Sequence, residues 1–497
     1  MGAVAFNGGL LLAVLYIPAS LVYAGMGLPH GGIVAAVSAV PLLLLIKRFY
    51  RAGKFIDGKL ANALEDFDEF RVCSKGFPGY RFVDLFNALE AFAKDDAKAT
   101  RIESQHSEGL QAIVAREFAS DETRTIMTPS RFSRPVDHDQ ERFFAADTFY
   151  IFRELPCGEV GKGVVLRLRR PEYSAEVYLE VGARLASRAE TIIEFIVKYA
   201  GRNSIYRNRT IEVAFEAELR QLPWGEVEQG TEIDVLIKPP SDVTRDNIVL
   251  DETVSAVLER NIIDVHRRRE ALLALGVPST RGVLFYGPPG TGKTYTCKYI
   301  AHRLEDATVV VASGHALHRI KSVFNVARML QPSVVVLEDV DLVFASRDQN
   351  MHGSSVGELL DELDGFAKDA AVIFILTTNA IERVEAAIKD RPGRISQCIL
   401  FDLPSATLRD QYLRKFLAPY DSGELDVERL VKATDRSSQA FLKEFVFRGV
   451  QIASENYSGE KAGLKLENTH FDEALDEMKQ SAGRQGAAIV GFHGGEV

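Results

Sequence analysis

One short stretch constrains this chain of 497 residues more than any other: GPPGTGKT, from Gly287 to Thr294. It has the form Gly, four residues, Gly-Lys-Thr, which is the form of a phosphate-binding loop. The apolar run VLFY precedes it and YTCKYIAHRL follows it, so the motif lies between an expected buried strand and an expected helix, as its chemistry requires. Since strands and helices alternate beyond this point, we expect a doubly wound parallel sheet.

The residues of this loop predict a site for ATP and Mg²⁺. Glycines allow backbone N–H groups to turn inward around phosphates at a helix N-terminus. Lys293 is expected to reach the terminal phosphates, and the Thr294 hydroxyl to ligate magnesium. The full set of expected nucleotide contacts is Gly287, Pro288, Pro289, Gly290, Thr291, Gly292, Lys293, Thr294 and Tyr295.

A second expected strand, in SVVVLEDVDLV (Ser333–Val343), ends in two carboxylates. Nucleotide hydrolases usually place Asp before Glu at such a strand end, and this chain reverses the order. By position, Glu338 is expected to take the magnesium contact and Asp339 to orient or deprotonate the attacking water. The side chain on the metal side is then one methylene longer and that of the base one methylene shorter. Because both roles remain chemically possible, we expect hydrolysis to be retained.

Further motifs follow in a recognisable order: LLDELDGF, then LTTN ending at Asn379, then RPGR with Arg391 and Arg394. With GPPGTGKT they resemble the AAA family of ATPases over about Ile248 to Ser481. The resemblance implies a ring of six subunits, ATP between neighbours and an α-helical lid after Pro404. It implies that Asn379 senses the γ-phosphate and that the two arginines are fingers offered to the adjacent subunit. An ion pair within the subunit is the alternative for those arginines.

The chain departs from the family pattern in three places. The order in LEDVD resembles the membrane-bound mitochondrial AAA translocases and related bacterial proteins. After Ser313 the usual Lys-aromatic-Val-Gly pore loop is missing, and His318, Arg319 and Ile320 are the remaining candidates, with one modest apolar side chain among them. Gln439 replaces a glycine that lets the lid approach the nucleotide, which puts that lid contact in question.

The first 46 residues contain no Asp, Glu, Lys or Arg, and two apolar runs flank GLPHGG. The first run is long enough to span a membrane and the second is marginal. The basic flank KRFYRAGK follows at once and should stay cytoplasmic. We expect a membrane hairpin at residues 1–54, which anchors the ATPase in a bacterial inner membrane with the ATPase module in the cytoplasm. A buried apolar hairpin is the alternative, and a signal peptide is disfavoured because no positive region precedes the first run.

Between the basic flank and the linker KPPSDVTRDN, the pattern changes to that of an α+β unit. TFYIFR, GVVLRLRR and EVYLEV read as an antiparallel meander, followed by a helix near Leu185–Tyr199 and a strand around Thr210–Phe215. We therefore expect an α/β P-loop AAA module, at 241–404 with its α-helical lid at 405–497, preceded by an α+β substrate or coupling domain at 55–240.

Composition narrows the function. The net charge of −10 disfavours nucleic acid as the main partner. The four cysteines are scattered, His315 and His318 lack a third ligand, and no HExxH zinc-protease motif occurs. We predict an ATP-hydrolysing, ring-forming protein, a hexamer, that remodels or translocates protein cargo at a membrane. The alternatives are a slow nucleotide-gated scaffold or switch and, from another class, a nucleic-acid motor.

Overall fold

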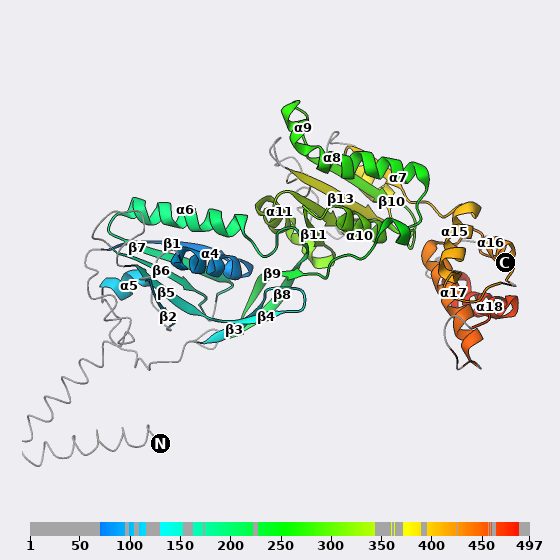
Figure 1. The fold of residues 1–497 in the computed structure, drawn as a ribbon, viewed down its shortest axis with the longest axis horizontal. Coiled ribbons are helices and arrows are strands. Elements are labelled where there is room, and N and C mark those ends of the chain that lie inside the picture. The colour runs from blue at the N-terminus through cyan, green and yellow to red at the C-terminus, as the bar shows by residue number, and fades with distance from the viewer. Residues whose placement is uncertain are drawn as a thin grey trace, which may run out of the picture. The chain divides into compact units, whose positions relative to one another are not determined.

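The computed structural model of this chain describes residues 70–94, 99–103, 109–115, 130–152, 163–171, 174–221, 227–342, 359, 362, 371–388, 395–423, 425–455, 457, 459 and 464–486. These residues form two compact units (Figure 1). The first comprises the segment ending at Phe77 together with Leu85–Phe132 and Phe143–Ile196. The second comprises Pro78–Asp84, Ser133–Arg142 and the chain from Val197 onward.

The first unit is built on a five-stranded sheet with the order β1-β7-β6-β5-β2. Its strands are β1 (Arg71–Pro78), β2 (Thr100–Glu103), β5 (Asp147–Phe152), β6 (Val164–Arg169) and β7 (Glu176–Ala183). Its helices are α4 (Phe82–Lys94), α5 (Leu110–Ala115) and α6 (Ala186–Arg202). A two-stranded sheet pairs β3 (Arg131–Pro135) with β4 (Glu141–Ala145). The strands β5, β6 and β7 pair antiparallel in sequence order, which confirms the predicted meander.

Strand β5 is buried along its whole length because helices cover both of its faces. Phe149 and Ile151 pack into a cluster with Leu110 and Ile113 of α5. On the opposite face, the Tyr150 hydroxyl donates to Glu90 of α4 at 2.6 Å. Since alternate residues of a strand point to opposite faces, one strand without exposed positions is what two covering layers require.

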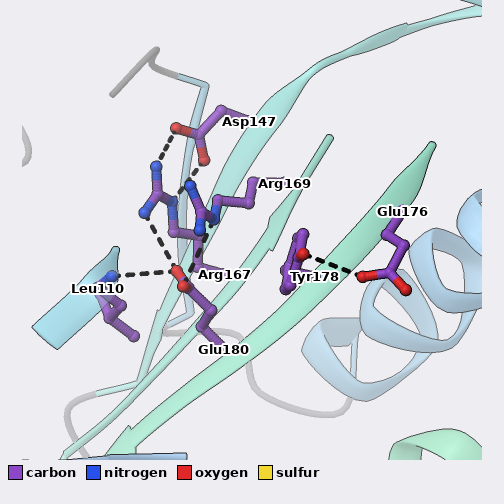
Figure 2. Close-up of polar contacts among 7 residues, drawn as sticks. All are labelled: Leu110, Asp147, Arg167, Arg169, Glu176, Tyr178 and Glu180. Atoms are coloured by element: carbon purple, nitrogen blue, oxygen red, sulfur yellow. Dashed lines mark hydrogen bonds and ion pairs between the residues drawn. The ribbon is translucent and has the colours of Figure 1, made fainter. Parts of the chain in front are cut away.

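A buried ion network joins the three central strands of this unit (Figure 2). Arg167 on β6 is fully buried and donates to both carboxylate oxygens of Asp147 on β5, at 2.8 and 2.6 Å. It also donates to Glu180 on β7 at 3.1 Å. Glu180 accepts from the Leu110 backbone N–H at 3.0 Å and lies 3.4 Å from the Arg169 guanidinium. A one-residue slip of any strand would bury an uncompensated charge, so the network fixes the register.

The second unit contains a seven-stranded sheet with the order β14-β10-β13-β12-β11-β8-β9. Its strands are β8 (Thr210–Gln221), β9 (Val227–Ile237), β10 (Arg281–Tyr286), β11 (Thr308–Ala312), β12 (Ser333–Leu337), β13 (Val372–Thr378) and β14 (Gln397–Leu400). The strands β14, β10, β13, β12 and β11 pair parallel with their neighbours. This is the doubly wound parallel sheet that the sequence predicts.

The helices of this sheet pack on its two faces. They are η2 (Arg245–Asn247), α7 (Glu252–Leu258), η3 (Glu259–Ile263), α8 (Asp264–Arg267), α9 (Arg269–Ala274), α10 (Lys293–Arg303), η4 (Gly314–Arg319), α11 (Ile320–Met329) and α14 (Ile381–Ile388). Along β12, Val335 and Leu337 join the cluster that contains α11, whereas Val334 and Val336 join the cluster that contains α10. Burial on both faces explains the unbroken apolar run before Glu338.

The β8–β9 hairpin extends the parallel sheet. β8 pairs parallel with β11, and β9 pairs antiparallel with β8. Ile211, Val213, Val235 and Ile237 pack into the same cluster as α11. The sequence pattern predicts the strand near Thr210 as part of the preceding α+β domain, but its hydrogen-bonding partner is β11 of the seven-stranded sheet.

Among the described residues after Pro404, four helices form a separate apolar cluster, as expected for the lid. They are α15 (Ala406–Leu417), α16 (Val427–Ala433), α17 (Gln439–Ser454) and α18 (Asn468–Gly486). Throughout the described ranges, we find no helix with the length and apolar character needed to cross a membrane. The two apolar runs within residues 1–46 lie outside those ranges.

Candidate functional site

The phosphate-loop residues Gly287–Thr294 connect β10 to α10 at the carboxyl edge of the parallel sheet. Gly287, Gly290 and Gly292 have φ values of 141°, 76° and 91°, which side chains rarely adopt. At Gly287 a Cβ atom would lie 2.1 Å from the carbonyl oxygen of Phe401, so a side chain cannot fit there. The backbone is therefore held in a turn that brings the chain directly into the N-terminus of α10.

Lys293 is a buried cation at the start of α10, with only 6% of its surface exposed. Its Nζ donates to the carbonyl oxygens of Gly287 and Pro288 at 2.8 and 2.9 Å. Burial lowers the pKa of Lys293 to about 8, and the charges of Asp339 and Asp341 oppose that shift. An ammonium group desolvated against neutral carbonyls gains much from an anion placed at the loop.

The two acids after β12 have different surroundings. Asp339 has φ 51°, a left-handed conformation that is unusual for a non-glycine residue, and its N–H donates to Thr377 Oγ1 at 3.0 Å. The Asn379 side-chain amide donates to Asp339 Oδ1 at 3.1 Å. The structure thus brings the expected base and the expected γ-phosphate sensor into contact, on a backbone strained as at many functional sites.

Glu338 lies on the other side, with the phosphate-loop threonine. Burial raises the pKa of Glu338, a hydrogen bond from the Thr294 hydroxyl lowers it, and the neighbouring charge of Asp339 raises it again. Thr294 and Glu338, the pair expected to hold the metal, therefore lie close to each other. Both offer oxygen atoms, which are the ligands that Mg²⁺ prefers.

Asp341 is a site residue that the sequence analysis missed. Its Oδ1 accepts from the Thr378 hydroxyl at 2.9 Å and from the Asn379 N–H at 3.2 Å, and its side chain is buried. It therefore fixes the turn that presents the Asn379 amide to Asp339. The signal was present in the sequence, because LEDVD contains a third acid two residues after Asp339.

The lid touches the phosphate loop despite the replacement of glycine by Gln439. Ala440 N donates to Gly290 O at 3.1 Å. A Cβ atom at Gly290 would lie 2.9 Å from Ser438 Oγ, so this glycine is also needed for the close approach of the lid. The residues on either side of Gln439 thus bring the lid against the phosphate loop.

The candidate pore residues are arranged differently from the expectation. Ile320 is 1% exposed and packs in the cluster beneath α11, so the prediction that it offers an apolar grip is wrong. His318 and Arg319 are exposed, and the Arg319 guanidinium lies 5.6 Å from the centre of the Phe215 ring. Arg391 and Arg394 lie outside the described residues.

The residues present fit both ATP and Mg²⁺. The loop offers a turned backbone that only glycine permits and a buried cation without a carboxylate hydrogen-bond partner among the described residues. The carboxyl edge of the sheet offers the Thr294–Glu338 oxygens and the Asp339–Asn379 pair. Such an arrangement can bind a nucleoside triphosphate and hold a base beside its terminal phosphate.

Comparisons with known proteins agree with this geometry. Residues 283–403 match the family model of the ATPase family associated with various cellular activities (AAA). The chain is 34% identical over 160 residues to a 26S proteasome regulatory subunit 8 homolog of Schizosaccharomyces pombe, covering 29% of this chain and 40% of that protein. It is 29% identical over 312 residues to a proteasome-activating nucleotidase of Methanothermobacter thermautotrophicus, covering 57% and 73%.

A third relative is named as a protease. The chain is 27% identical over 266 residues to an ATP-dependent zinc metalloprotease FtsH of Syntrophotalea carbinolica, covering 49% of this chain and 40% of that protein. The chain thus spans less than half the length of two of these three relatives. Together with the family match, they confirm the predicted resemblance and the P-loop α/β module.

Proposed function

We propose that this chain, an AAA-family ATPase, hydrolyses ATP to remodel or translocate a protein cargo. The observation that carries the proposal is the contact of Asp339 with Asn379 beside the Thr294–Glu338 pair and Lys293. When bound, Mg²⁺ supplies charge neutralisation for the phosphates. Relatives named proteasome-activating nucleotidase and ATP-dependent zinc metalloprotease support an energy-dependent action on proteins.

The residues of the site divide the work between binding and hydrolysis. Lys293 is placed to neutralise the terminal phosphates, and Thr294 with Glu338 to hold the metal. Asp339 then accepts the proton of the attacking water, while Asn379 and, through it, Asp341 keep that carboxylate oriented. The shorter arm of Asp339 requires the water to be held close.

The test separates hydrolysis from binding. In Asp339→Asn we expect ATP binding to persist and turnover to fall by about 10² to 10⁴, since the amide cannot accept a proton. In Glu338→Gln we expect the magnesium dependence of binding to weaken. Turnover and nucleotide affinity are measured on the full chain, with Asp476→Asn, an exposed site on α18, as the control. The reverse division of effects would contradict the assigned roles.

We propose further that the chain acts as a homo-oligomeric ring, of six subunits by the family resemblance, in which Arg391 and Arg394 reach the neighbouring subunit's nucleotide. The residues 1–54 are proposed to anchor the ring in a membrane, as a hairpin. We expect the full chain to stay in the membrane fraction after high-salt and carbonate washes. Release by either wash would contradict the anchor.

A slow nucleotide-gated switch is the second candidate. The reversed acids favour it, because the Asp339 side chain is one methylene shorter than the usual base and holds the water less easily. Steady-state turnover, measured with and without membrane, distinguishes the two. A motor shows turnover that rises with cargo, whereas a switch shows stable nucleotide occupancy and slow turnover that cargo does not change.

A further inference from the structure

Gln439, the first residue of α17, lies at the contact between the lid and the phosphate loop. Its two neighbours both approach Gly290. Ala440 N donates to the Gly290 carbonyl at 3.1 Å, and Ser438 Oγ would meet a Cβ atom at Gly290 at 2.9 Å. The Gln439 side chain therefore lies beside the nucleotide site and outside the apolar cluster of the lid.

The amide nitrogen of Gln439 already has a hydrogen-bond partner, Tyr412. The Tyr412 hydroxyl donates to the carbonyl oxygen of Val249, in the segment that leads into α7. Burial raises the pKa of Tyr412 to about 12, and a side-chain hydrogen bond with Gln439 opposes that rise. The Tyr412 proton is already donated to Val249, and Oε1 of Gln439 accepts no hydrogen bond from any described residue, so the amide nitrogen of Gln439 is the group that faces the Tyr412 oxygen.

The other end of the amide has no partner. Oε1 of Gln439 is buried and accepts no hydrogen bond from any described residue. Leaving a buried acceptor unpaired costs about 1–3 kcal/mol, so native structures rarely keep one without a reason. Because Tyr412 holds the nitrogen end, the amide cannot turn round to present a donor instead. Gln439 Oε1 is thus a hydrogen-bond acceptor of fixed orientation, to which an N–H group of a ligand can donate.

Purine bases differ in the group that they would present to such an acceptor. The 6-amino group of adenine donates hydrogen bonds, whereas the 6-oxo group of guanine or hypoxanthine only accepts them. A site that pairs a substrate N–H discriminates against an analogue without it, since the protein group is then left unpaired. Tyr295, which directly follows Thr294 and is 43% exposed, offers an aromatic surface in the same region.

We propose that Gln439 is a specificity-determining residue, whose Oε1 accepts a hydrogen bond from the 6-amino group of the bound nucleotide. This inference rests on the proposed ATP site. It assigns base selection to a side chain of the lid that is itself held by Tyr412. The selection is therefore coupled to the Tyr412–Val249 contact, which joins the lid to the segment before α7.

The test compares three diphosphates that are not hydrolysed: ADP, inosine diphosphate and purine riboside diphosphate, which has hydrogen at position 6. Each displaces a fluorescent ribose-labelled ADP from the full chain in the presence of Mg²⁺. We expect ADP to bind about 5- to 10-fold more tightly than the other two, the value of one hydrogen bond. In Gln439→Met we expect ADP affinity to fall to that of the other two, whose own affinities stay unchanged.

Two further variants make the result specific. Gln439→Glu keeps an acceptor of the same length and should keep the preference for ADP. Gln451→Met makes the same replacement at an exposed glutamine of α17 and should change nothing. If the Gln439→Met chain does not fold, Gln439→Asn withdraws the acceptor by one methylene and should reduce the preference in the same way.

The outcomes distinguish this inference from the proposed function. Equal binding of ADP and purine riboside diphosphate by the wild-type chain would overturn the role of Gln439, as would an unchanged preference in Gln439→Met or Gln439→Asn. Neither result affects the ATP site itself. Failure of the wild-type chain to bind the labelled ADP at all would overturn the proposed function and this inference together.

Discussion

Two of the buried cations among the described residues, one from each unit, have opposite kinds of hydrogen-bond partner. Arg167 in the first unit meets the carboxylates of Asp147 and Glu180 inside the sheet (Figure 2). Lys293 in the second unit meets only two carbonyl oxygens as hydrogen-bond partners among the described residues. The chain itself completes the first site, whereas a ligand is needed to complete the second. A buried charge without a hydrogen-bond partner of opposite charge in the described part of the chain thus distinguishes the binding site at Lys293 from the structural network at Arg167.

Substitution of Arg167 gives the largest expected effect on stability. In Arg167→Met two carboxylates remain buried without their cation, and breaking a buried pair in this way costs about 3–5 kcal/mol. Chemical denaturation measures the loss in the free energy of unfolding, if the unfolding is monitored with a probe placed in the first unit.

The control removes the charges together. Arg167→Met combined with Asp147→Asn and Glu180→Gln leaves no buried charge in the triad and should recover part of the loss. If Arg167→Met alone were as stable as the wild type, the network would not be a structural element of the first unit.

Asp84 is an intermediate case; it lies in the first turn of α4, within the segment Pro78–Asp84 that belongs to the second unit. Its Oδ1 accepts from the Ile205 N–H at 2.9 Å, but Arg81 is 3.7 Å away, and burial raises the pKa of Asp84 to about 6. Because the folded-state pKa lies above the ordinary value of 3.8, the folded chain binds more protons between the two values. The contribution of Asp84 to the free energy of unfolding is therefore fully present below about pH 4. It is lost as the pH rises through about 6, which lowers the free energy of unfolding by about 3 kcal/mol.

The Asp84→Asn variant isolates that contribution. The amide oxygen can still accept from Ile205 N–H, and the charge that burial disfavours is gone. We expect the variant to gain stability over the wild type at pH 7.5 and to lose that advantage at pH 4. An identical pH dependence of unfolding in both proteins would show that Asp84 does not carry the effect.

Lys293→Met should have the smallest effect on stability, although it removes a buried cation just as Arg167→Met does. The lost ammonium leaves only carbonyl groups, and its burial was unfavourable, as its lowered pKa indicates. We expect a stability change within about 1 kcal/mol, and an ATP affinity lower by about 10- to 150-fold, the value of a hydrogen bond to a charged group. Wild-type ATP affinity in this variant would contradict the contrast between the two cations.

These cases also explain what the sequence could and could not predict. The phosphate loop, the acids after β12 and Asn379 were predictable because their spacing along single strands and turns determines where they meet. The partner of β8 was not, since a strand pattern specifies a strand and says nothing of which edge it joins. Ile320 was assigned to a pore surface because its position followed the family, while its burial depends on how α11 packs. Asp341 stayed hidden because its role appears only through contacts with Thr378 and Asn379, 37 and 38 residues away.

The β8–β9 hairpin has a practical consequence for anyone who divides the protein. β11 would otherwise present an unpaired row of N–H and C=O groups along one side of the seven-stranded sheet, and β8 covers that row. A fragment cut at the linker, near Lys238, would keep every nucleotide-site residue and yet expose this edge together with the apolar patch that Ile211 and Val235 cover. We expect such a fragment to self-associate, and a fragment that begins before Thr210 to remain dispersed.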